Sequence, residues 1–199
     1  MKLGVFGGTF DPIHMGHLVV AEEAREQLGL DEVVFVPAGE PWFKADMRIT
    51  DASHRFAMVE LAVASNPAFL TSDLEMVRSG PSYSVDTLEL LHKSLGDAVE
   101  LFVVLGADAL ADLARWHKPK RILELATVVG VARPSHLSVD LQQMATDLES
   151  SEDRLKLLRG PLTEVSGTEI RRRVREGLSI RYLVPEPVEA YLQEHMLYR

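Results

Sequence analysis

The chain contains no cysteine among its 199 residues. Disulfide bonds, thiolate metal sites and cysteine nucleophiles are therefore excluded, and a reducing cytoplasm is the natural compartment. No covalent cross-link is needed to stabilise the fold, because 46% of the residues are apolar and a chain of this length can bury a sizeable core.

Long apolar runs are also absent. The N-terminal stretch MKLGVFGGTF is interrupted at Gly7-Gly8 before a hydrophobic segment of membrane-spanning or signal-peptide length can form. We therefore expect a cytoplasmic protein with no membrane association.

The chain has no excess of positive charge, since 21 basic residues stand against 30 acidic ones and the net charge is −9. This balance argues against a nucleic-acid binder. It does not argue against a small anionic substrate, because the local field at a site matters more than the total charge. Basic residues gather between Ser166 and Arg181, which fits a solvated helix face as well as an anion site. The sequence leaves the oligomeric state open and is compatible with a homo-oligomer.

Short β-rich apolar runs alternate with helical patterns along the chain. Runs with little polar alternation are typical of strands that are buried on both faces of a parallel sheet. The four expected strands are Leu3–Phe6, Val33–Val36, Leu101–Leu105 and Thr127–Ala132. The five helices expected between and after them are Gly16–Leu28, Ala52–Ala64, Ser84–Ser94, Ala107–Arg115 and Lys120–Leu125.

This alternation predicts an α/β fold, a doubly wound Rossmann-like parallel sheet with helices on both faces. We expect one domain over residues 1–199, with a C-terminal helical segment from about 166 to 199 packed on the core. The polar stretch Ser135–Arg159 is interpreted as an outer helix or a mobile connection. A capping-box pattern at Ser166–Glu169 predicts a helix over Ile170–Glu176, and a last helix is expected from Pro187 to about Leu197.

The densest motif follows the first strand and opens the first helix. It runs from Gly7 to His17 and reads GGTFDPIHMGH. Backbone N–H groups and the helix dipole collect phosphate at such a place. Gly8 lets the chain approach a ligand closely, Gly16 clears space between two imidazoles, and His14 and His17 can direct ring N–H donors at one anion.

Two other readings of the histidines remain open at this point. Spaced three residues apart, His14 and His17 could be zinc ligands of a hydrolase, although no third ligand is evident nearby. They could also simply cap the helix. Either reading leaves the glycines and Thr9 unexplained.

The segment Gly8–His17 resembles the first signature of the HxGH nucleotidyltransferase superfamily, and Val165–Arg171 resembles the second, with departures at Val165 and Gly167. The resemblance implies that His14, His17 and Arg171 hold the phosphates of a nucleoside triphosphate. It places these further residues at the ATP site: Gly8, Thr9, Phe10, Gly16, Ser166, Thr168 and, after the strand at 127–132, Arg133.

The middle of the chain is similar to nicotinate-nucleotide adenylyltransferases. The segments that carry this likeness are Val36–Lys44, His54-Arg55, Ser82–Leu88, Gly106–Asp108 with Trp116, and Ser179–Pro185. The chain departs from the usual pattern at Trp42-Phe43 and at Ser84, both in substrate loops. The family resemblance implies transfer of the adenylyl group of ATP to nicotinate mononucleotide, with Mg²⁺ bound mainly by phosphate and water.

Four residues receive acceptor-side roles from this resemblance. Trp116 would stack on the pyridine ring, and Ser84 would place a helix N-terminus at the nicotinate carboxylate. Lys44 would neutralise phosphate, and Asp108 would bind a sugar hydroxyl or position the nucleotide. The competing interpretations are a core tryptophan packed on Leu113, a plain N-cap serine and a solvated lysine. Nicotinamide mononucleotide or phosphopantetheine as acceptor, and a non-catalytic nucleotide-binding protein, remain as alternatives.

Overall fold

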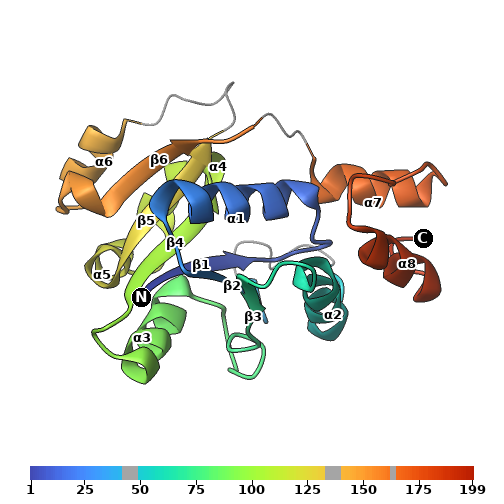
Figure 1. The fold of residues 1–199 in the computed structure, drawn as a ribbon, viewed down its shortest axis with the longest axis horizontal. Coiled ribbons are helices and arrows are strands. Elements are labelled where there is room, and N and C mark those ends of the chain that lie inside the picture. Colours follow the sequence, from blue (N-terminus) through green and yellow to red (C-terminus); the bar gives the residue numbers. More distant parts are fainter. Residues whose placement is uncertain (42–48, 133–139, 162–164) are drawn as a thin grey trace.

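The computed structural model describes residues 1–41, 49–132, 140–161 and 165–199. Its centre is a sheet of six parallel strands in the order β3-β2-β1-β4-β5-β6 (Figure 1). The strands are β1 (Lys2–Gly8), β2 (Glu32–Pro37), β3 (Phe69–Thr71), β4 (Glu100–Gly106), β5 (Ala126–Ala132) and β6 (Leu155–Arg159).

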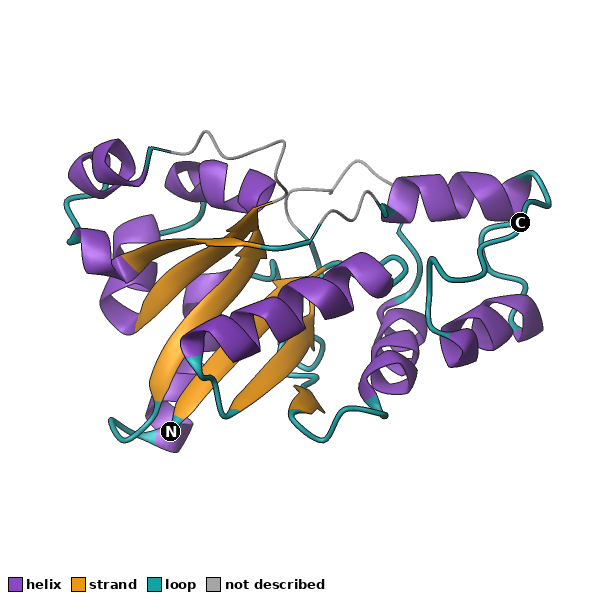
Figure 2. Ribbon diagram, turned by 45° about the horizontal axis from the view of Figure 1, so that its top comes forward, coloured by secondary structure: helices purple, strands orange, loops and turns teal. Residues whose placement is uncertain are grey.

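Helices follow the strands in alternation and cover both faces of the sheet (Figure 2). They are α1 (Met15–Leu28), α2 (Ala52–Val63), α3 (Ser84–Leu95), α4 (Ala107–Ala111), α5 (Pro119–Leu125), α6 (Leu141–Asp147), α7 (Gly167–Arg175) and α8 (Glu186–Glu194). The doubly wound parallel fold that the sequence predicts is therefore confirmed.

Burial on both faces explains why the strands are almost continuously apolar. In β2, Val33 and Phe35 enter one core cluster, whereas Val34 and Val36 enter the other. The first cluster lies under α1 and α2, and the second under α3, α4, α5 and α6. The C-terminal helices α7 and α8 contribute Ile170, Val188 and Leu192 to the first cluster, and in Figure 1 they project beyond the end of β1.

The sequence did not predict the two edge strands. The stretch interpreted as an outer helix or connection instead contains α6 and then the strand β6 at Leu155–Arg159. Its LKLLR pattern mixes polar and apolar residues, because an edge strand is covered less completely than a central one. The strand β3 is only three residues long, too short to produce a periodic signal.

Two helix boundaries also differ from expectation. The helix expected at Ala107–Arg115 ends at Ala111, and a 3₁₀ turn follows at Leu113–Arg115. The last helix begins at Glu186, with Pro187 inside its first turn, and ends at Glu194. No helix in the part of the chain that the structure describes is both long and apolar enough to cross a membrane.

The strand order changes direction at β1 and β4, which lie side by side. Their pairing stops at Val5 and Val103, but β1 continues to Gly8 beside β2 and β4 continues to Gly106 beside β5. The last residues of these two neighbouring strands are thus no longer paired with each other. In doubly wound sheets this switch point forms the ligand crevice at the carboxyl ends of the strands.

Gly39 provides a test of how closely the loop after β2 packs against residue 75. A Cβ added at Gly39 would lie 2.2 Å from the Glu75 carbonyl oxygen, a backbone atom that cannot rotate aside. Gly39→Ala should therefore lower the free energy of unfolding by roughly 1–3 kcal/mol, measured by urea denaturation. The control is Gly106→Ala, because a Cβ there meets nothing within 4 Å. Equal losses in the two variants would contradict this close packing.

Candidate active site

The turn after β1 is built around the buried ring of Phe10. Phe10 has φ 48, a left-handed backbone conformation that is rare for a large side chain. Its ring packs edge-on against Phe6 and against His17, with the His17 ring centroid 5.0 Å away, and a Cβ on Gly8 would collide with it. Burial of the ring stabilises the strained turn, which places the next residues at the mouth of the crevice.

The two histidines lie together at the start of α1. Their rings are stacked, with centroids 3.7 Å apart and an interplanar angle of 20°. The backbone N–H of His14, the N-cap residue, donates to Nδ1 of His17 over 3.2 Å. A neutral His17 must then carry its proton on Nε2, so that atom is a donor. His17 can therefore accept the N-cap N–H at Nδ1 and still present a donor at Nε2. A Cβ on Gly16 would lie only 3.1 Å from Nδ1 of His14, so the glycine leaves room for that ring.

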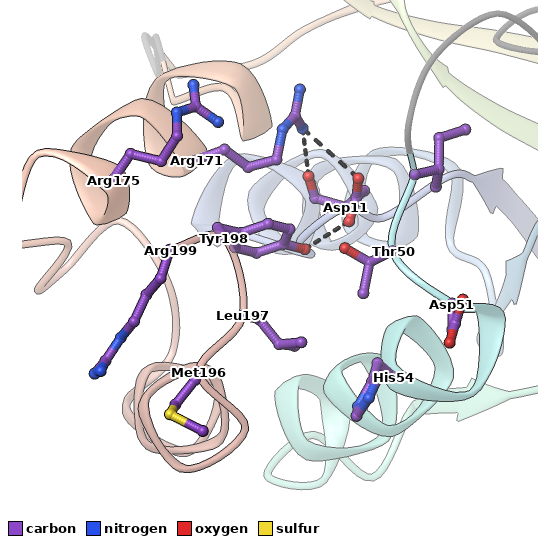
Figure 3. A pocket seen from close by; sticks show the side chains of 11 residues that line it. Asp11, Thr50, Asp51, His54, Arg171, Arg175, Met196, Leu197, Tyr198 and Arg199 are labelled. Atoms are coloured by element: carbon purple, nitrogen blue, oxygen red, sulfur yellow. Dashed lines mark hydrogen bonds and ion pairs between the residues drawn. The ribbon is translucent and has the colours of Figure 1, made fainter.

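The second motif meets this turn from the other end of the chain. Nη1 of Arg171, on α7, donates to the backbone carbonyl of Asp11 over 2.6 Å, across a separation of 160 residues (Figure 3). Gly167 permits the approach, since a Cβ there would lie 2.9 Å from the same carbonyl oxygen. Nη2 of Arg171 lies 3.4 Å from the Thr168 hydroxyl, in the first turn of α7. The imidazole pair and Arg171 therefore flank one short loop.

Only half of the capping box expected in α7 is formed. The Ser166 hydroxyl accepts the N–H of Glu169 over 3.2 Å and so acts as the N-cap. The Glu169 carboxylate instead pairs with Arg172 on the same helix. Ser166 and Thr168 are both exposed at the N-terminus of α7, where backbone N–H groups and the helix dipole attract anions.

Arg55 is a buried cation to which the sequence analysis assigned no role. Its side chain is 1% exposed. Nε donates to the carbonyl of Thr50, Nη1 to that of Thr9 and Nη2 to that of Gly39, over 2.8, 2.8 and 3.2 Å. Burial lowers the pKa of Arg55, and the nearby Asp11 carboxylate acts in the opposite direction. Its position in the buried stripe of α2, with Met58 and Ala62, is the sequence signal that could have identified it.

A small cavity lies on the other side of the turn, at the ends of β1, β2 and β4. It has a volume of about 30 Å³, and Gly7, Ser84 and Trp116 are among its lining residues. Ser84 is the first residue of α3, and the N-cap is Tyr83, so the plain N-cap interpretation of Ser84 is wrong. Trp116 packs against the core cluster that contains Leu113 and also faces the cavity. The core interpretation of this tryptophan is therefore confirmed, and its stacking role stays a prediction.

Glu75 lines the same cavity and was not identified from the sequence. It is 6% exposed, and its Oε1 accepts the Thr87 hydroxyl over 2.6 Å. Burial raises the pKa of Glu75 above its ordinary value, against opposing hydrogen bonds from Thr87 and Ser82. Ser82 is also bonded to Glu40 in the loop after β2. Glu75 thus ties the first turn of α3 to the neighbouring loops.

The remaining predicted residues lie near this edge or outside the described residues. Asp108 is exposed in the first turn of α4, immediately after β4. Lys44 and Arg133 lie outside the residues that the structure describes, as do Trp42 and Phe43. Within the described ranges, no group of three or more His, Asp or Glu side chains could hold a metal ion, so the zinc interpretation finds no third ligand there.

Comparison of the chain with known families identifies the class of protein to which this fold and this site belong. A family model described as cytidylyltransferase-like matches residues 5–173. The chain therefore belongs to the cytidylyltransferase-like family. The matched segment begins in β1 and ends in α7, so it includes both the glycine turn and Arg171.

Within that family, the chain is similar over its whole length to proteins named probable nicotinate-nucleotide adenylyltransferase. One from Thermomicrobium roseum is 48% identical over 198 residues, covering 100% of this chain and 92% of the relative. One from Roseiflexus sp. is 47% identical over 197 residues, covering 99% of this chain and 98% of the relative. These relatives confirm the resemblance that the motifs predicted.

A solved structure shares the fold. The Plasmodium falciparum nicotinic acid mononucleotide adenylyltransferase complexed with NaAD superposes with a TM-score of 0.80, covering 99% of this chain and 97% of that chain. The sequence identity is 19%, so this likeness concerns the architecture of the sheet and its helices.

The pH dependence of stability tests the buried state of Glu75. Because its pKa is raised above 4.5, the folded chain binds this proton more tightly than the unfolded chain. This group's contribution to stability therefore falls as the pH rises from about 4.5 through the raised value. Glu75→Gln has no titratable group at this position. Its free energy of unfolding relative to that of the original chain should therefore increase as the pH rises through this window, measured by urea denaturation at a series of pH values. Exposed Glu60→Gln is the control, and identical pH profiles for all three proteins would refute the assignment.

Proposed function

We propose that this protein transfers the adenylyl group of ATP to nicotinate mononucleotide, producing nicotinate adenine dinucleotide and pyrophosphate in NAD biosynthesis. The observation that carries the proposal is the meeting of the stacked His14–His17 pair and Arg171 around one loop at the switch point of the sheet. Relatives 47% and 48% identical to the chain carry the corresponding enzyme name, which supports the choice of acceptor.

The reaction is a single in-line displacement. An oxygen of the nicotinate mononucleotide phosphate attacks the α-phosphorus of ATP, a new P–O–P bond forms, and the bond to pyrophosphate breaks. No general base is required, because a phosphate monoester with a second pKa of about 6 is mostly dianionic at neutral pH. The protein contributes positioning and neutralisation of charge.

On the ATP side, the donors converge from both motifs. His14 and His17 bind the α- and β-phosphates, and Nε2–H of His17 is a donor whose direction is set by the bond at Nδ1. Arg171 and the N-terminus of α7 at Thr168 receive the departing pyrophosphate. The buried charge of Arg55, bonded to the carbonyl of Thr9, adds to the positive potential under the same turn.

Mg²⁺ accompanies the triphosphate in this proposal. The carboxylate nearest to the turn, Asp11, is buried and hydrogen-bonded to Tyr198, so it is a poor metal ligand. These residues fit an ion that phosphate oxygens and water coordinate, with few or no protein ligands. When bound, the ion would neutralise phosphate charge.

On the acceptor side, the cavity at Trp116 and Ser84 receives the pyridine ring and its carboxylate. A volume of about 30 Å³ holds one or two water molecules, so the ring enters as the half-buried Trp116 side chain moves. Ser84 and the first N–H groups of α3 bind the carboxylate at the positive helix end, and Asp108 binds a sugar hydroxyl. The family resemblance assigns further phosphate contacts to Lys44 and Arg133.

A panel of acceptors tests the proposed reaction. With ATP and Mg²⁺, release of pyrophosphate should be fastest with nicotinate mononucleotide. The nicotinamide analogue lacks the charge-assisted bond to the carboxylate, so its kcat/KM should be roughly 10- to 150-fold lower. Phosphopantetheine should be a poor acceptor because it has no ring to stack. Higher kcat/KM with either alternative would reassign the acceptor, and no turnover with any of them would favour a non-catalytic nucleotide-binding protein.

Removal of either imidazole tests the proposed hold on the triphosphate. His14→Ala and His17→Ala should each lower kcat by roughly 10²- to 10³-fold, the usual effect of losing one preorganised donor to developing charge. The thermal melting curves should stay close to that of the original protein. His92→Ala, at the exposed end of α3, is the control. Near-normal kcat in one of the two variants would remove that histidine from the mechanism.

A further inference from the structure

The segment after α8 folds back onto the turn that follows β1. The Tyr198 hydroxyl donates to Oδ1 of Asp11 over 2.6 Å, across 187 residues of sequence. Figure 3 shows the Arg171 and Tyr198 side chains reaching Asp11 one above the other from the C-terminal segments. Asp11 therefore joins the last residues of the chain to the phosphate-binding turn.

Asp11 binds both partners with different atoms. Its carbonyl oxygen accepts Nη1 of Arg171, while its carboxylate accepts the Tyr198 hydroxyl. The second carboxylate oxygen, Oδ2, is 4.0 Å from Nη1 of Arg171, which is too far for a hydrogen bond. The guanidinium is thus held by a neutral carbonyl at a short distance and by the carboxylate only weakly.

A buried carboxylate needs hydrogen-bond donors, and at Asp11 the position of the donor sets the orientation of the carboxylate. The Asp11 side chain is 7% exposed, so an oxygen without a partner would be costly. Without the Tyr198 hydroxyl, the carboxylate can turn toward the Arg171 guanidinium, which lies 4.0 Å from Oδ2, and a hydrogen-bonded carboxylate–guanidinium pair is a stronger contact than the present one. A tyrosine hydroxyl is protonated at neutral pH and can donate, and burial, followed by the bond to Asp11, raises the pKa of Tyr198 further.

We propose that Tyr198 is a positioning residue of the active site: its hydroxyl turns the Asp11 carboxylate away from Arg171 and so keeps the guanidinium available to the pyrophosphate part of ATP. The inference rests on the proposed function, in which Arg171 receives the departing pyrophosphate. It adds a residue from the C-terminal end to a site otherwise formed by the two signature motifs.

The variant Tyr198→Phe removes only the hydroxyl. A cavity of about 570 Å³ adjoins Asp11, Arg171 and Tyr198, so water can reach the site and the loss of stability should be small. We expect kcat to fall and the Kd for inorganic pyrophosphate to rise, each by roughly 5- to 30-fold. Pyrophosphate binding is measured by calorimetry and needs no turnover.

Tyr191→Phe is the matched control. The Tyr191 hydroxyl is 2.9 Å from Nδ1 of His54, where α8 packs on α2, so this variant also loses one hydroxyl bond from the C-terminal segment. If the segment acts only through stability, both variants should shift the melting temperature and activity alike. A positioning role predicts that only Tyr198→Phe changes kcat and pyrophosphate affinity.

A double-mutant cycle identifies the route of the effect. If Tyr198 acts through Asp11, adding Tyr198→Phe to Asp11→Asn should change the pyrophosphate Kd no further. Additive effects, or equal behaviour of Tyr198→Phe and Tyr191→Phe, would overturn the inference. Failure of the proposed function is seen separately, as pyrophosphate binding by the original chain without turnover of ATP and nicotinate mononucleotide.

Discussion

The hydrogen bond from Arg171 to the Asp11 carbonyl is the contact on which the rest of the site depends. It joins α7, whose Ile170 is anchored in the core, to the turn after β1. A helix N-terminus and a guanidinium therefore lie beside the short loop that leads into the two stacked imidazoles. The Tyr198 hydroxyl binds the carboxylate of the same residue, so Asp11 links three distant segments.

The crevice itself follows from the sheet. Because β1 and β4 cease to pair before they end, their last residues diverge at the carboxyl edge of the sheet, where the small cavity lies. A buried ionisable side chain lies on each flank of it. Arg55 donates to three loop carbonyls beside the glycine turn, and Glu75 ties α3 to its neighbouring loops beside the cavity at Trp116. Each group thus adds side-chain hydrogen bonds between separate segments of the chain.

The central strands were predictable from sequence because burial on both faces leaves an unbroken apolar run, as in β2 and β4. The edge strands β3 and β6 were missed because one is too short and the other is half polar. The glycine turn and the imidazole pair were recognisable because their residues lie within one short segment. The second signature was recognised by resemblance, and its departure at Gly167 acquired a physical reason only when the Asp11 carbonyl was seen beside it.

The sequence by itself therefore determined the alternation of strands and helices, the glycine turn that opens the first helix, and the family. Only the tertiary structure decided that Arg171 and Tyr198 both bind Asp11 and that Arg55 donates to three loop carbonyls. It also decided that Glu75 lines the same cavity as Ser84. The reason is the range of the interactions. Periodicity and turn chemistry act over a few residues and leave a pattern in the chain, whereas contacts across 46, 160 and 187 residues depend on how the sheet folds and leave none.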